Sequence, residues 1–145
     1  MEENIIQQND IKSIEYRTMM EAQLAQDFWF MCKEKPDYFG VDDWSELCIG
    51  MECGNGWLAA WYDTCRQLLT EVKSDFGISQ FKEKFGTANV YYYGGITPYG
   101  QQLIHEFEEE SADICEVCGK SGKLRGKGCY MTLCDECWKE SQNER

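Results

Sequence analysis

The sequence predicts an α+β protein, in which helices pack on a β-hairpin or small antiparallel sheet and a small cysteine-rich module follows. Three patterns predict it: the apolar stripe of an amphipathic helix over residues 57–72, a hairpin over residues 78–93 and two cysteine pairs after residue 114. At 145 residues the chain is long enough to bury a core. We divide it into an N-terminal helical segment (1–40), an α+β core (41–112) and a cysteine module (113–145).

The first helix is expected over residues 10–35. Pro36 should end it, because proline lacks an amide hydrogen and clashes with the preceding turn. The stretch that follows, residues 37–55, has no sustained period and predicts a loop with a short strand at residues 47–52. The apolar face of the helix comprises Ile11, Ile14, Met20, Leu24, Phe28 and Met31, at steps near three and four.

The second helix is expected to start after Gly54-Asn55-Gly56 and to end near Gly77. Its apolar stripe, with steps of three and four, comprises Trp57, Trp61, Cys65, Leu68 and Val72.

The hairpin is predicted by aromatic and β-branched residues on both sides of Gly86-Thr87, with lysines on the polar face. Gly94-Gly95 closes it. Thr97 and Pro98 predict the N-cap and first residue of a third helix. This helix leads into the cysteine module, and its apolar face is expected to comprise Tyr99, Leu103, Phe107 and Ile114.

Four cysteines of the module predict a zinc site. They form two Cys-x-x-Cys pairs, 15 residues apart: Cys115, Cys118, Cys134 and Cys137. Each pair lets two sulfurs reach one metal at about 2.3 Å, and two pairs complete a tetrahedron. The second pair reads as the first turn of a helix, so a treble-clef or zinc-ribbon-like arrangement of knuckle, hairpin and helix is expected.

Four thiolates leave no coordination position for water or substrate, so we expect one structural Zn²⁺ rather than a catalytic one. Cys129 is a fifth thiol in the module, and we expect it to be packed and unreactive rather than redox-active.

Charge and composition argue against several classes of protein. The formal charge of −12, from 26 acidic and 14 basic residues, argues against a generic nucleic-acid binder and suits a basic protein partner, although acidity that simply maintains solubility is the favoured explanation. No window approaches the roughly 18 apolar residues of a membrane span. The N-terminus lacks a basic region followed by an apolar stretch, so we expect a reducing, cytoplasmic location and free thiols.

Two further groups of residues predict a binding site less strongly. Cys48, Cys53 and Cys65 could form a second metal site, although their spacing matches no familiar ligand pattern and a packed role is favoured. A nucleotide-binding surface could form from cations beside aromatic planes, although a solvated lysine face over core aromatics is ordinary hairpin chemistry and is favoured. Its residues would be Trp57, Lys82, Lys84, Tyr91 and Tyr93.

The sequence offers no convincing catalytic set. His105 is the only histidine, which excludes mechanisms that need two imidazoles. Glu106, Glu109 and Glu110 could bind a divalent ion for hydrolysis, but consecutive glutamates on a helix mostly face solvent. We therefore lean towards a protein that is not an enzyme.

Three segments together resemble a group of uncharacterised small zinc-binding proteins from bacteriophages and bacteria. They are MECGNGW at 51–57, QFKEKFGTANVYYYGG at 80–95 and the stretch from EEES at 108 to TLCDECW at 138. The group's pattern is a GxGW helix start, a KEKFG hairpin and a CxxCG module ending in TLCDxC. The resemblance implies a phage protein in a bacterial cytoplasm and transfers no catalytic residues.

The leading hypothesis is a non-enzymatic, zinc-stabilised interaction protein that binds a host or phage protein, in host takeover or counter-defence. The first alternative is a protein that sequesters a nucleotide signal. The second is a metal-dependent hydrolase or nuclease.

Overall fold

The computed structural model describes residues 10–32, 47 and 49–143. Its main sheet has three strands in the order β1-β2-β3: β1 (Met51–Glu52), β2 (Gly77–Lys84) and β3 (Thr87–Tyr93). β2 and β3 form the predicted antiparallel hairpin, whereas β1 pairs with β2 in parallel, Met51 opposite Phe81. The fold is therefore α+β, as predicted, with a mixed rather than purely antiparallel sheet.

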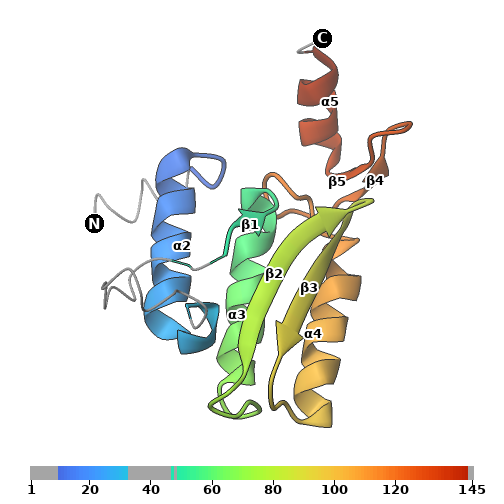
Figure 1. Ribbon diagram of the computed structural model, residues 1–145. Helices are drawn as coiled ribbons and strands as arrows, with labels where there is room; N and C mark the ends of the chain where they lie inside the picture. The colour runs from blue at the N-terminus through green and yellow to red at the C-terminus, as the bar shows by residue number, and fades with distance from the viewer. Residues whose placement is uncertain (1–9, 33–46, 48, 144–145) are drawn as a thin grey trace.

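Two helices, α3 (Leu58–Leu68) and α4 (Pro98–Ser111), cover one face of the hairpin (Figure 1). Aromatic side chains fill the space between them. The ring centroids of Trp61 and Phe81 lie 5.2 Å apart, and Phe107 from α4 lies 5.1 Å from Trp61. The predicted stripe is buried from Trp57 to Leu68. The helix ends at Leu68 rather than near Gly77, so Val72 lies beyond it, half-buried, in an isolated bridge to Ile96.

The first helix, α2 (Ile14–Asp27), is shorter than predicted. Ser13 caps it by accepting a hydrogen bond from the Tyr16 amide at 3.0 Å. The chain turns extended at Phe28 and continues as a 3-10 helix at Trp29–Met31, which buries Phe28 and Phe30 together. Ile14, predicted to face the core, is exposed. Residues 33–35 and Pro36 lie outside the described residues.

The hairpin turn lies one residue earlier than predicted, at Phe85-Gly86, where both φ angles are positive (53° and 85°). At the start of α4, the Thr97 hydroxyl accepts a hydrogen bond from the Gly100 amide at 3.0 Å, and Pro98 follows as predicted. Tyr99 is exposed rather than on the apolar face, and Ile114 lies beyond the end of the helix.

Side chains of α4 hydrogen-bond the outer edge of β3. Ser111 Oγ accepts from the amide of Ala88 at 2.8 Å, and Glu108 Oε2 accepts from the amide of Val90 at 2.9 Å. These two bonds fix the helix along the strand.

The C-terminal module consists of a two-stranded ribbon, β4 (Lys123–Arg125) with β5 (Met131–Leu133), followed by α5 (Asp135–Asn143). It adjoins the tip of the β2–β3 hairpin (Figure 1). No helix in the described part of the chain is both long and apolar enough to cross a membrane. The division of the chain into three segments stays a prediction.

Candidate metal centre

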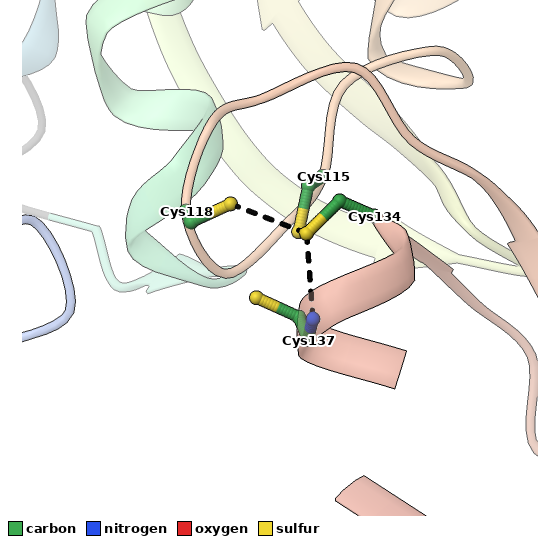
Figure 2. Close-up of side chains that lie close together, drawn as sticks. All are labelled: Cys115, Cys118, Cys134 and Cys137. Carbon is green, nitrogen blue, oxygen red and sulfur yellow. Dashed lines mark hydrogen bonds between the residues drawn. The ribbon is translucent and has the colours of Figure 1, made fainter. Parts of the chain in front are cut away.

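The four predicted cysteines converge at the base of the C-terminal module (Figure 2). Cys115 and Cys118 lie in the turn that follows α4, Cys134 lies between β5 and α5, and Cys137 lies in the first turn of α5. Their four sulfur atoms all lie within 4.8 Å of one another. The Sγ atoms of Cys118 and Cys134 are 3.6 Å apart, close to the roughly 3.8 Å edge of a tetrahedron with 2.3 Å metal–sulfur bonds.

Backbone geometry orients the thiols. The amide of Cys137 points at Cys134 Sγ, 3.4 Å away. In the first pair, the amide of Gly119 donates to the carbonyl of Cys115 at 2.9 Å, and Gly119 has a φ of +82° that favours glycine. The turn therefore favours glycine at position 119.

The pKa values of three thiols of the cluster, those of Cys115, Cys118 and Cys137, are shifted by their surroundings. Burial raises the pKa of Cys118 and of Cys137. Burial also acts on Cys115, but hydrogen bonds from the amides of Cys134, Cys118 and Val117 outweigh it and lower the pKa of Cys115 to about 7. Four thiolates this close together require a positive ion between them, and four sulfurs in a tetrahedron suit Zn²⁺.

Lys12 brings a positive charge to the centre from the other end of the chain. Its ammonium donates to Glu140 on α5 at 3.1 Å. This hydrogen bond is the main reason that the pKa of Lys12 is raised, and the neighbouring Cys137 raises it further. A cation at this position offsets part of the net charge of −2 on a zinc ion with four thiolates.

The GNGW segment joins the centre to the core. Gly56 donates from its amide to the carbonyl of Glu116 at 2.7 Å, between the two cysteines of the knuckle. A Cβ at Gly56 would lie 2.0 Å from the Cys115 carbonyl oxygen, so only glycine permits this approach. Trp57, fully buried, donates from Nε1 to the carbonyl of Ile114 at 2.8 Å.

Glu116 lies buried at the same junction. Its Oε2 accepts from the amide of Gly54 at 2.9 Å, and burial raises the pKa of this carboxyl group. A Cβ at Gly54 would come within 2.4 Å of the Glu116 carbonyl oxygen. Both glycines of the motif therefore serve the contact between α3 and the knuckle.

Helix α2 is held to this loop by two side chains. Arg17 donates to the carbonyl of Cys53 at 2.6 Å and also to that of Met51. Asn55 donates from its amide nitrogen to the carbonyls of Ile11 and Ser13 at 2.8 and 2.9 Å. The N-terminal helix thus depends on the same motif as the metal centre.

The KEKFG segment also contacts the module. The buried Thr132 hydroxyl donates to the carbonyl of Gly86 at 2.6 Å. Within the turn, Glu83 Oε2 accepts from the Gly86 amide at 2.7 Å. The three motifs that are recognisable in the sequence therefore meet where the core contacts the C-terminal module. We call this contact, formed by Gly54, Gly56, Gly86, Glu116 and Thr132, the joint.

Thr132→Val should weaken that joint. Valine matches the shape of threonine but leaves the Gly86 carbonyl without its donor, so we expect a loss of about 1–3 kcal/mol in the free energy of unfolding. Urea denaturation of the zinc-loaded protein measures it. The exposed substitution Thr70→Val is the control and should change stability little; equal effects from both would contradict this role for the hydroxyl.

The residues of the suggested nucleotide surface are not all brought together. Lys82 and Tyr91 meet on the sheet face opposite the helices, with Lys82 Nζ 5.6 Å from the ring centroid. Tyr93 lies across Gly77 on the neighbouring strand. Lys84 is exposed near the turn, whereas Trp57 is buried in the core.

The other thiols are separate from the centre. Among the described residues, the four-sulfur cluster is the only group of three or more side chains found that could hold a metal ion. Cys48 lies outside these residues. Burial raises the pKa of Cys53 to about 12 and that of Cys65 well above its ordinary value, so both stay protonated. Cys129 was predicted to be packed; this is wrong, because the ribbon places it in solvent.

The glutamates of the suggested hydrolase site lie on the exposed side of α4. Glu106 accepts from Gln102 at 2.9 Å, and Glu109 lies 2.7 Å from His105 Nε2. Glu110 is exposed in the last turn of the helix.

The sequence did not predict the contact between the core and the C-terminal module. The residues that form this contact, Gly54, Gly56, Glu116 and Thr132, are not of types that indicate a functional site. The short spacing of glycines before a tryptophan was the available hint. Comparison of the chain with family models, with curated proteins and with solved structures found no match.

Proposed function

We propose that the protein is a non-enzymatic interaction protein, stabilised by one structural zinc ion, that binds a basic surface of a host or phage protein in a bacterial cytoplasm. The resemblance of the three motifs supports the phage setting. The four-sulfur centre supports a stabilising rather than catalytic metal, because tetrahedral thiolate ligation leaves no place for a substrate.

The observation that carries the proposal is an acidic and aromatic stripe on α4. Tyr99, Glu106 and Glu110 follow one another at steps of seven and four, which places them along one side of the helix. All three are exposed, Tyr99 to 54%. The stripe is exposed and offers one ring and two carboxylates to a partner.

The helix gains nothing from its acidic end. Negative charges at a helix C-terminus oppose the macrodipole, at a cost of about 0.3–1 kcal/mol each, and the last turn of α4 contains no basic residue. Glu108 accepts a hydrogen bond from the amide of Val90 on the β3 edge, but Glu110 has no such structural role among the described contacts. A role in binding a partner protein accounts for the negative charge of Glu110, which does not stabilise its own helix.

The double substitution Glu106→Gln with Glu110→Gln tests this role. We expect it to abolish recovery of a stoichiometric partner from bacterial lysate at low salt, while stability stays equal or rises slightly because the end of the helix loses charge. Affinity capture with mass spectrometry, beside thermal unfolding, measures both.

The matched control removes the same charge elsewhere, with Glu15→Gln and Asp63→Asn, both exposed. Partner recovery that falls equally in the two double variants would contradict the α4 surface and leave only a net-charge effect. If the protein instead hydrolyses a nucleic acid, and if this activity requires a divalent ion and is lost in the α4 variant, the hydrolase alternative would replace the proposal.

A further inference from the structure

Two segments of this acidic protein carry six of its 14 basic residues and only one acidic residue. Residues 118–133 contain three lysines, one arginine and no acidic residue, although the whole chain carries −12. Residues 77–93 add two lysines and one glutamate. The basic residues of the two segments are Lys82, Lys84, Lys120, Lys123, Arg125 and Lys127.

The two basic segments adjoin in space. The hydrogen bond from Thr132 to Gly86 joins the hairpin tip to the ribbon. A Cβ at Gly86 would come within 2.5 Å of a Leu124 methyl group, so the turn and β4 are in close contact. Figure 1 shows the hairpin tip beside the β4–β5 ribbon, with the sheet face opposite α3 and α4 left bare by the described elements.

The same two segments also carry exposed aromatic rings. On the bare sheet face, Tyr91 is 44% exposed beside Lys82. At the turn, Phe85 is 68% exposed, and Tyr130 in the ribbon is 40% exposed. We call Lys82, Lys84, Phe85, Tyr91, Lys123, Lys127 and Tyr130 the basic aromatic surface.

Phe85 is the least expected member. Its φ of 53° lies in the left-handed region, which glycine and asparagine occupy at lower cost than a bulky aromatic residue. The exposed ring gains little from burial, so neither the turn nor the core accounts for it. A ligand that stacks on the ring accounts for an exposed phenylalanine at this position.

Acidic neighbours limit the available charge. Asp135 pairs with Arg125 at 2.5 Å, Glu136 lies 3.8 Å from Lys120, and Glu52 is the register neighbour of Lys82. Lys84, Lys123 and Lys127 are left as the cations most able to contact phosphates. Glu83 lies between Lys82 and Lys84, and its Oε2 accepts from the Gly86 amide in the turn.

We propose that the basic aromatic surface binds single-stranded nucleic acid, with bases stacked on Phe85, Tyr91 and Tyr130 and phosphates contacted by the lysines. Exposed rings distinguish this ligand from an acidic peptide, which would use the cations alone. They also distinguish it from a duplex, whose bases are already stacked on one another.

Fluorescence anisotropy with a labelled 12-nucleotide oligothymidine, or its uridine counterpart, tests the proposal on the zinc-loaded protein. Alanine at a stacking ring costs about fivefold to a hundredfold in affinity per base, so Tyr91→Ala should weaken binding by that factor. Phe85→Asn should do the same while keeping the turn, because asparagine tolerates a positive φ. With three phosphate contacts, affinity should fall roughly 20-fold between 50 and 200 mM salt.

Tyr99→Ala on α4 removes an equally exposed ring and should leave oligonucleotide binding unchanged. The proposal is overturned if the oligonucleotide does not bind at 50 mM salt, or if Tyr99→Ala weakens it as much as Tyr91→Ala. It is also overturned if polyglutamate binds as tightly, which indicates an acidic peptide site, or if a mononucleotide does, which indicates a nucleotide pocket.

Discussion

Cys118→Ser is expected to remove bound zinc and to unfold the C-terminal module from about residue 113 onward. A serine hydroxyl cannot replace a thiolate in the tetrahedron, and structural zinc contributes about 10–16 kcal/mol to folding in small zinc modules. The ribbon would lose its position against Gly86, and α5 would lose its first turn. Native mass spectrometry counts the metal, and amide hydrogen exchange locates the unfolded residues.

Cys129→Ser is the matched control, because Cys129 lies in the same module but is exposed and outside the cluster. It should keep one zinc ion per chain and an unchanged melting temperature. A Cys118→Ser protein that kept the module folded would contradict a stabilising metal. A folded variant that lost a specific activity would point instead to a catalytic one.

Gly56→Ala is expected to destabilise the protein by about 3 kcal/mol or more, although it adds a single methyl group. Its Cβ would meet three backbone atoms of the knuckle, the nearest at 2.0 Å, and backbone cannot move aside as a flexible side chain can. The hydrogen bond from Gly56 to Glu116 would also be lost. Urea denaturation gives the loss in free energy, and zinc competition with a chelator shows whether the centre weakens with it.

Gly50→Ala supplies the control, since no atom lies within 4 Å of a Cβ built at that position. Its stability should change by less than about 0.5 kcal/mol. If Gly56→Ala behaved like Gly50→Ala, the close approach of α3 to the knuckle would not be needed for folding.

Local patterns predicted the elements whose stability is local. Trp57, Trp61, Cys65 and Leu68 repeat at helical spacing and are all buried. Thr97 caps α4 because a hydroxyl one residue before a proline satisfies an amide that the helix leaves free. The four cysteines of the candidate centre were predicted as a set, because metal coordination restricts cysteine spacing more tightly than packing does.

Long-range pairing was not predictable in the same way. The parallel contact of β1 with β2 joins Met51 to Phe81, and two residues of strand are too few to show a period. The end of α2 was misplaced because Phe28 continues the helical spacing but turns extended to reach the core. The contact of Lys12 with Glu140 joins the two ends of the chain, which no local pattern reveals.

In the candidate site, too, the local pattern was predictable and the long-range contacts were not. Spacing identified its ligands but not their surroundings: the buried Glu116, the Arg17 bonds and the hydroxyl of Thr132 depend on which segments meet. The exposure of Phe85 depends on a turn whose φ angles the sequence did not indicate, because phenylalanine is uncommon there.

The hydrogen bonds from β3 to Ser111 and Glu108 also affect how the protein behaves at high concentration. A strand at the border of a sheet normally offers its amides to any other extended chain, which is a route to aggregation. Here the amides of Ala88 and Val90 already have side-chain acceptors on the same molecule. A second strand would have to displace both before it could pair, so α4 protects this border of the sheet against self-assembly.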